Sequence, residues 1–288
     1  MLKAALWMMG AIIAFSLMAV GARELAGEIN IFQILFFRSV MGLVIMSVLI
    51  LGVGRYSLFV TRRVNLHVGR NIFHFAGQYG WFVGIGLLPL AEVFALEFTV
   101  PLWTVLIASI FLKEYLTARK LTAILVGVIG VLVIIRPGAQ ILDVASLIVL
   151  ASAACFGVSY VATKGLSSSE SSLTVLFYMC LIQLPVSLLF TVGHWMEPTP
   201  LQWLWVGIVS VAALGAHYCV TRAMKLAEAG VVVTLDFLRL PLIAAVGVVF
   251  YNEAFDIALI LGAALMLIGN LINLHRPGAS TLLAKPPK

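Results

Sequence analysis

Ten apolar runs, each close to the length needed to cross a bilayer, dominate this sequence. A hydrocarbon core of about 30 Å needs about 20 helical residues, because a helix keeps its backbone polar groups bonded in lipid. Charged residues make up 10% of the chain, against about 25% in soluble domains, which excludes an ordinary soluble fold. We therefore predict an all-α integral membrane protein with ten transmembrane helices, at 4–21, 31–52, 70–88, 90–112, 120–136, 144–163, 172–193, 202–221, 229–250 and 254–274.

The Lys and Arg residues between these runs predict the orientation, since loops rich in both face the cytoplasm. One side is expected to carry Lys3, Arg55, Arg62, Arg63, Arg70, Lys113, Arg119, Lys120, Lys164, Arg222, Lys225, Arg276, Lys285 and Lys288. The other side carries Arg23 and Arg136. We therefore expect a multi-pass protein of the cell (inner) membrane with both termini in the cytoplasm. The net charge of +6 lies in these links and forms no soluble basic face for nucleic acid.

The second half of the chain resembles the first. The tetrapeptide RPGA begins at 136 and again at 276, 140 residues later, and Glu97 corresponds to Asp236 at an offset of 139. Five spans per half is an odd number, so the second half enters the membrane from the opposite side. The sequence thus predicts two inverted five-helix repeats, related by a pseudo-two-fold axis in the membrane plane. The expected domains are a first repeat at 1–139, a second repeat at 140–279 and a short cytoplasmic tail at 280–288.

Ten helices in two halves, each with a Glu before its last helix (Glu114 and Glu253), resemble the drug/metabolite transporter superfamily, and its EamA branch in particular. The resemblance covers essentially the whole chain and rests on pattern, without an invariant signature. It implies an alternating-access carrier of small organic solutes. It also implies a central cavity between the third, fourth, eighth and ninth spans, with the first and sixth beside them. Members carry amino acids, nucleosides, vitamins and other metabolites.

Four charged residues lie inside the predicted spans: Arg38, Glu97, Asp236 and Arg239. A charge near the bilayer centre costs about 2.5–3.5 kcal/mol on insertion scales, so it normally faces a partner or a watery cavity. One interpretation pairs Arg38 with Glu97, at similar depth, and Asp236 with Arg239 at i,i+3, only to make insertion tolerable. The other interpretation makes these groups bind a charged or zwitterionic solute, with one carboxylate taking the driving proton. Arg239 has no charged counterpart in the first half, and we expect it to contribute to specificity.

Prolines and glycines inside the spans predict local features of the backbone. Pro101 lacks the N–H that would bond to the carbonyl of Glu97, and Pro241 has the same effect in the second half. Each proline either kinks its helix or exposes backbone acceptors at the level of a ligand. Gly80 and Gly84 have the small-xxx-small spacing that is typical of close helix packing.

Histidines and aromatic residues complete the predicted site. His74 and His217 correspond between the halves at matched depth, which indicates either helix–helix hydrogen bonds or a gate with a pH-sensitive pair. Aromatic residues are dense in the third and fourth spans, and a subset of them could stack a planar substrate beside Gln78. The predicted substrate-binding residues are Glu97, Arg239, Asp236, Arg38, His74, Gln78, Tyr79, Trp103 and His217.

We predict a secondary active transporter that moves a small organic metabolite across the inner or plasma membrane by alternating access, coupled to protons or another gradient. Aromatic residues with mixed charges suit an amino acid or an aromatic vitamin such as riboflavin. The alternatives are an intramembrane enzyme or a channel-like protein. The sequence contains no compact catalytic cluster such as HExxH, so we predict no enzymatic activity. Two pseudo-equivalent halves also differ from the pore rings of a channel.

No cofactor, metal site or catalytic residue is expected. The three cysteines, Cys155, Cys180 and Cys219, lie in separate apolar runs, without the spacing of a metal site or a disulfide framework. The expected partners are a small-molecule substrate and membrane lipid, with no nucleic acid. We expect a monomer or a weak homodimer.

Overall fold

The computed structural model of the chain describes residues 2–111, 118–135, 143–193, 195–227, 232, 235–236, 238–254 and 256–274. Its helices are α1 (Leu2–Glu24), α2 (Ile31–Val53), the short 3-10 helix η1 (Tyr56–Phe59), α3 (Val64–Leu87), α4 (Leu90–Glu97), α5 (Val100–Phe111), α6 (Ala118–Ile135), α7 (Val144–Ser167), α8 (Ser172–Thr191), α9 (Pro200–Leu226), α11 (Arg239–Tyr251) and α12 (Ile257–Leu274). Glu114, both RPGA segments and the predicted tail at 280–288 lie outside the described residues.

Five of these helices, α1, α2, α7, α8 and α9, are long and apolar enough to cross a membrane individually. The shorter helices α6, α11 and α12 contain apolar stretches as well. Together they confirm the prediction of an all-helical, multi-pass membrane protein.

One boundary was predicted wrongly, and it matters for function. α3 begins at Val64, six residues before the predicted span. Arg70, which we counted among the cytoplasmic charges as the first residue of the predicted span 70–88, therefore lies well inside this helix and is only 4% exposed. The first turns of α3 are polar, so a search for apolar runs places its start too late.

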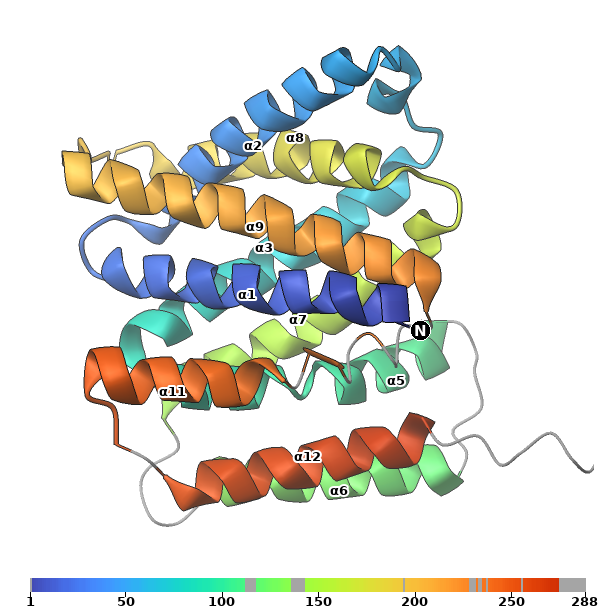
Figure 1. The fold of residues 1–288 in the computed structure, drawn as a ribbon, viewed down its shortest axis with the longest axis vertical. Coiled ribbons are helices and arrows are strands. Elements are labelled where there is room, and N and C mark those ends of the chain that lie inside the picture. Colours follow the sequence, from blue (N-terminus) through green and yellow to red (C-terminus); the bar gives the residue numbers. More distant parts are fainter. Residues whose placement is uncertain are drawn as a thin grey trace, which may run out of the picture.

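The helices pack in pairs that bring the two halves of the chain together. α1 lies against α9, α3 against α7, α2 against α8, α4 against α11 and α6 against α12. Figure 1 shows the α2 and α8 pair at one end of the long axis and the α6 and α12 pair at the other. The buried apolar core runs between them, through α1, α3, α4 and α9.

Small residues allow α3 and α7 to approach closely. A side-chain carbon on Gly80 would collide with Ser152, and one on Gly84 would collide with Val149. A carbon on Gly77 would lie 2.9 Å from the ring of Phe156. The predicted close packing at Gly80 and Gly84 is therefore confirmed, since only glycine leaves room for the facing helix.

The fourth predicted span is broken into two helices. α4 ends at Glu97 and α5 begins at Val100, so Pro101 lies in the first turn of a new helix, where a missing N–H costs little. In the second half, α11 begins at Arg239, which places Pro241 in a first turn as well. Each proline thus follows a charged residue. Glu97 is the last residue of α4, and Arg239 is the first residue of α11.

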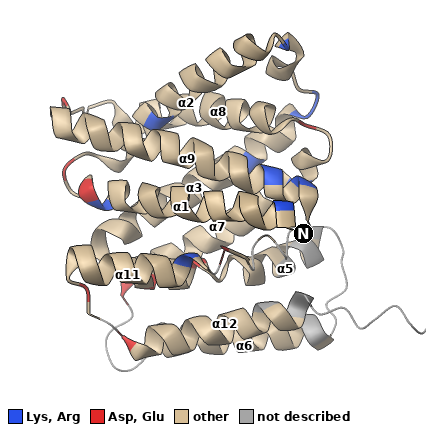
Figure 2. Ribbon diagram, viewed as in Figure 1, with Lys and Arg blue, Asp and Glu red and all other residues tan. Residues whose placement is uncertain are grey.

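Charges separate along the bundle. Figure 2 shows most Lys and Arg at the end where the chain begins and most Asp and Glu at the opposite end. Lys164 and Lys225, for example, lie in the last turns of α7 and α9.

At the acidic end, an ion pair ties several helices together. Arg23, at the end of α1, donates to Glu253 Oε1 at 2.7 Å and to the Leu88 carbonyl at 2.8 Å. Leu90 N–H, the first residue of α4, donates to the same Glu253 carboxylate at 2.9 Å. A carboxylate at a helix N-terminus is favourable, because it satisfies an unpaired N–H and complements the helix dipole. We refer to Arg23, Glu253 and Leu90 as the outer latch.

Candidate functional site

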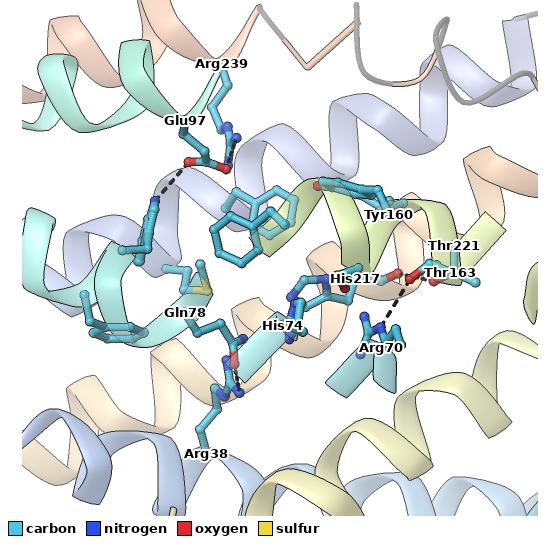
Figure 3. A pocket seen from close by; sticks show the side chains of 17 residues that line it. Arg38, Arg70, His74, Gln78, Glu97, Tyr160, Thr163, His217, Thr221 and Arg239 are labelled. Carbon is cyan, nitrogen blue, oxygen red and sulfur yellow. Dashed lines mark hydrogen bonds and ion pairs between the residues drawn. The ribbon is translucent and has the colours of Figure 1, made fainter. Parts of the chain in front are cut away.

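A cavity lies at the centre of the bundle, between helices of both halves. Its volume is about 40 Å³, below the usual range of about 300–1,000 Å³ for small-molecule sites, so the helices must move apart before a metabolite fits. Its polar lining consists of Arg38, Arg70, His74, Gln78, Glu97, Ser159, Tyr160, Thr163, His217, Thr221 and Arg239, and its aromatic walls include Phe15, Trp81, Phe82 and Phe156. Figure 3 shows these side chains converging from several helices.

One end of the cavity holds two carboxylates around one guanidinium. Arg239 donates to Glu97 Oε1 at 2.9 Å and to Asp236 Oδ2 at 2.8 Å. Trp81 Nε1 donates to the second oxygen of Glu97 at 2.9 Å. We call Glu97, Arg239 and Asp236 the acidic triad, because with both carboxylates ionised its net charge is −1.

Aromatic rings surround the guanidinium of the triad. The Arg239 Cζ atom lies 4.8 Å from the centroid of the Phe15 ring, 4.6 Å from that of Phe94 and 5.6 Å from that of Phe98. Such contacts stabilise a desolvated cation by about 2 kcal/mol. Arg239 is only 2% exposed, and its charge is balanced by rings and carboxylates, while its Nε is buried without a hydrogen-bond partner in the described part of the chain.

The other end of the cavity holds two arginines with neutral partners. Arg38 donates to Gln78 Oε1 at 2.8 Å and to Gln183 Oε1 at 2.6 Å. Arg70 donates to Thr163 Oγ1 at 3.2 Å and to Asn71 Oδ1 at 2.7 Å. We call Arg38 and Arg70 the arginine pair. Neither forms an ion pair with a carboxylate among the residues that the structure describes.

Gln183 connects the arginine pair to His74. A guanidinium can only donate, so Arg38 fixes which atom of the Gln183 amide is the oxygen. The Gln183 nitrogen then faces His74 Nδ1, at 2.9 Å, and must donate to it. His74 is therefore a neutral imidazole with its proton on Nε2. Its ring lies 4.8 Å from that of His217, so the two predicted histidines do meet in the cavity.

The structure places seven of the nine predicted site residues in or beside the central cavity. Six of them line the cavity: Arg38, His74, Gln78, Glu97, His217 and Arg239. Asp236 lies just beyond it, beside a smaller space of about 20 Å³ that shares Glu97, Tyr160 and Arg239 with the cavity.

The remaining two predicted residues point elsewhere. Tyr79 is 38% exposed and stacks on Phe32, with the ring centroids 4.6 Å apart. One residue along a helix is a rotation of about 100°, which turns Tyr79 away from the Gln78 face. Trp103 donates to Thr99 and packs against α7 at Gly157. Neither side chain lines the central cavity.

The predicted pairing of the membrane charges was half right. Asp236 pairs with Arg239, as expected from their i,i+3 spacing. Arg38 does not pair with Glu97, because α2 packs against α8 and its arginine reaches Gln78 and Gln183 instead. Glu97 pairs with Arg239. Similar depth in the membrane was a poor guide, since it carries no information on which helices are neighbours.

Several cavity residues were not singled out from the sequence. Arg70 was counted among the loop charges, and Tyr160, Thr163 and Thr221 carry no signal that separates them from other members of apolar helices. Gln183 lies in α8, is fully buried and connects the arginine pair. A buried polar side chain in an apolar helix is itself a signal for function, and Gln183 could have been found that way.

Comparisons with known proteins show what the chain as a whole is similar to. The EamA-like transporter family matches residues 2–136 and 144–274. An S-adenosylmethionine uptake transporter of Rickettsia bellii (strain RML369-C) is 22% identical over 269 residues, which cover 93% of this chain and 92% of the relative. A riboflavin transporter of Brucella anthropi is 30% identical over 254 residues, which cover 86% of this chain and 89% of the relative.

A second riboflavin transporter, from Vibrio cholerae serotype O1, is 26% identical over 273 residues and covers 93% of this chain. A known crystal structure shares the fold, with a TM-score of 0.67 at 22% identity over 94% of this chain and 96% of the other. These relatives are small-metabolite transporters, and this chain is one too. With nearly its whole length matched in two stretches, the chain belongs to the EamA-like transporter family.

Proposed function

We propose that this protein is a secondary carrier that moves a small planar metabolite by alternating access through the central cavity, driven by a proton bound at the acidic triad. The triad is the observation that carries the proposal. It places two carboxylates on one guanidinium beside a cavity between the halves. A second carboxylate without a cation of its own can bind and release a proton as its surroundings change.

Asp236 is the better candidate for the proton site. Its Oδ1 atom is buried and has no hydrogen-bond partner in the described part of the chain, whereas both oxygens of Glu97 are bonded. A buried acceptor without a donor is unfavourable, and a proton on that oxygen would relieve it.

The pairing of helices supports two inverted repeats. Exchanging the halves converts the α1 and α9 pair into the α7 and α3 pair, and it converts the α2 and α8 pair and the α6 and α12 pair into themselves. All of these pairs are in contact. Carriers of this design bind substrate where the repeats meet and change access by moving one group of helices against the other.

The lining supports a planar substrate with polar groups. Phe15, Phe82 and Phe156 offer ring faces beside the histidines and Gln78. The relatives are named for S-adenosylmethionine and riboflavin, which both contain a fused heteroaromatic ring. We therefore propose a heteroaromatic metabolite or an aromatic amino acid.

The charge distribution supports cytoplasmic termini in an inner or plasma membrane. The end that carries most Lys and Arg would then face the cytoplasm (Figure 2). The outer latch would close the opposite face in this conformation.

Substrate is identified first, by thermal-shift screening of the purified protein against riboflavin, S-adenosylmethionine and amino acids, since a ligand stabilises the state that binds it. The hit is then tested for counterflow in proteoliposomes, and a hit without counterflow contradicts the carrier.

Coupling is tested by accumulation of the substrate under an imposed pH gradient. We expect Asp236→Asn to keep counterflow but lose accumulation, with Glu97→Gln as the comparison. If both variants accumulate substrate like the wild type, the triad carries no proton.

A further inference from the structure

We infer that the arginine pair forms an anion subsite, which binds a carboxylate or phosphate group of the transported metabolite. The inference rests on the proposed carrier function, because it specifies the substrate of the same cavity. It predicts that the metabolite carries a negatively charged group at one end and a ring at the other.

Arg38 is the first part of this subsite. It is 4% exposed, and its hydrogen-bond acceptors are the amide oxygens of Gln78 and Gln183. Its other terminal nitrogen, Nη1, is buried without a partner in the described part of the protein. The side chain lines the cavity. A buried guanidinium donor that faces a cavity without an acceptor is positioned to bind an anion from that cavity.

Arg70 supplies the second positive charge. It is 4% exposed and lines the same cavity, and its acceptors are the Thr163 hydroxyl and the Asn71 amide. Both acceptors are neutral, so they satisfy hydrogen bonds and leave the charge uncompensated. Figure 3 shows Arg38 and Arg70 on either side of His74.

A polar chain links the two arginines into one unit. Gln183 accepts from Arg38 at 2.6 Å, and its nitrogen lies 3.4 Å from Asn71 Oδ1. Asn71 Oδ1 in turn accepts from Arg70 at 2.7 Å. Because every acceptor in this chain is an amide oxygen, the chain fixes the positions of two charges and neutralises neither.

Two unneutralised charges in a membrane interior are unfavourable. Two other arginines of the described residues are matched, since the buried Arg239 has two carboxylates and Arg23 pairs with Glu253. A structural arginine would be expected to have such a partner. The arginine pair lacks one among the described residues, and an anionic ligand would supply it.

The two ends of the cavity also fix how the ligand would lie. The acidic triad, with its net negative charge, repels an anion, while the arginine pair attracts it. Phe156, whose ring centroid lies 5.8 Å from that of His74, and Phe15 line the space between. The anionic group would therefore lie at the end of the cavity that Arg38 and Arg70 line, with the ring against the phenylalanines.

Three minimal probes test the subsite without knowledge of the natural substrate: phenylacetate, phenyl phosphate and the neutral phenylacetamide. Binding to the full-length protein in nanodiscs is measured by calorimetry. We expect at least one anion to bind about tenfold or more tightly than the amide. Which anion is preferred distinguishes a carboxylate site from a phosphate site.

Variants tie this preference to the arginine pair. Arg38→Gln and Arg70→Gln should each reduce the preference for the anion to about one, and Arg38→Lys should keep part of it through its charge. Arg222→Gln is the matched control, because Arg222 contacts Trp7 and does not line the cavity. Thermal unfolding of each variant verifies that it is folded.

The subsite is refuted if phenylacetamide binds the wild type as tightly as both anions, if none of the probes binds at millimolar concentration, or if both glutamine variants keep the preference. Failure of the carrier function looks different. A protein with an arginine-dependent preference for anions but no counterflow would refute the carrier and keep the subsite. Counterflow of a substrate without a negatively charged group would refute the subsite alone.

Discussion

The two ends of the central cavity hold the same kind of residue in opposite settings. Arg239 is matched by two carboxylates at 2.9 and 2.8 Å, whereas Arg38 and Arg70 have only amide and hydroxyl partners. All three are almost completely buried. The difference indicates separate roles, since the charge of Arg239 is balanced by carboxylates within the folded chain, whereas the charges of Arg38 and Arg70 would be balanced by a ligand. The predictions below test that contrast from the largest expected effect to the smallest.

Removing the matched arginine should have the largest effect. Arg239→Met leaves Glu97 and Asp236 buried without their cation, and breaking a buried pair in this way costs about 3–5 kcal/mol. Unfolding of the purified variant in detergent measures the loss. A triple variant that also carries Glu97→Gln and Asp236→Asn removes the unpaired charges and should recover stability. Wild-type stability of Arg239→Met alone would contradict the role that we give to the ion pairs.

Trp81→Phe tests the same end of the cavity more gently. It removes the indole N–H that donates to Glu97 Oε2 at 2.9 Å. Hydrogen bonds to charged groups contribute about 1.5–3 kcal/mol, so we expect a loss of about 2 kcal/mol in the free energy of unfolding. Phe82→Leu is a control, since it alters a neighbouring ring without touching a carboxylate. If both variants lose equal stability, packing rather than the hydrogen bond explains the result.

Removing an unmatched arginine should affect stability less than removing the matched one. Arg38→Gln gives up two hydrogen bonds to neutral amides but also removes an uncompensated charge, so we expect a change within about 1 kcal/mol. The unfolding assay used for Arg239→Met makes the two values comparable. A loss as large as that of Arg239→Met would mean that Arg38 serves mainly to hold α2, α3 and α8 together.

The outer latch contains an arginine that is also paired with a carboxylate, but in a partly exposed position. The side chains of Arg23 and Glu253 are 20% and 12% exposed, so the pair should contribute at most about 1 kcal/mol. Glu253→Gln should therefore leave global stability nearly unchanged but accelerate hydrogen exchange at the Leu90 amide, which loses its carboxylate acceptor. Glu28→Gln, a nearby carboxylate outside the latch, should leave this exchange unchanged. Unaltered exchange in Glu253→Gln would show that the latch does not hold α4.

Much of the helical layout could be predicted from hydropathy. The runs predicted at 31–52 and 144–163 correspond to α2 and α7, because long apolar segments in lipid have few alternatives to a helix. The start of α3 could not be predicted in this way. The polar side chains His67, Arg70 and Asn71 near its start are buried, and hydropathy does not distinguish such a segment from a loop.

The site was predictable only where its geometry is local. Asp236 and Arg239 are one helical turn apart, so their contact follows from spacing. The contact between Glu97 and Arg239 crosses 142 positions in sequence. It depends on α4 lying against α11, which spacing cannot give. The contrast between matched and unmatched arginines depends on three-dimensional neighbours in the same way.

The latch also has a consequence for how the protein is made. α4 has eight residues, about 12 Å of helix, too short to cross a bilayer alone. Its first N–H and the guanidinium of Arg23 obtain their carboxylate from Glu253, which the ribosome adds 163 residues after Leu90. When the first half of the chain leaves the ribosome, Arg23 and the Leu90 N–H therefore still lack this carboxylate partner. These contacts of the first half can form only after Glu253 has been synthesised, so the first half reaches its final structure only once the second half is present.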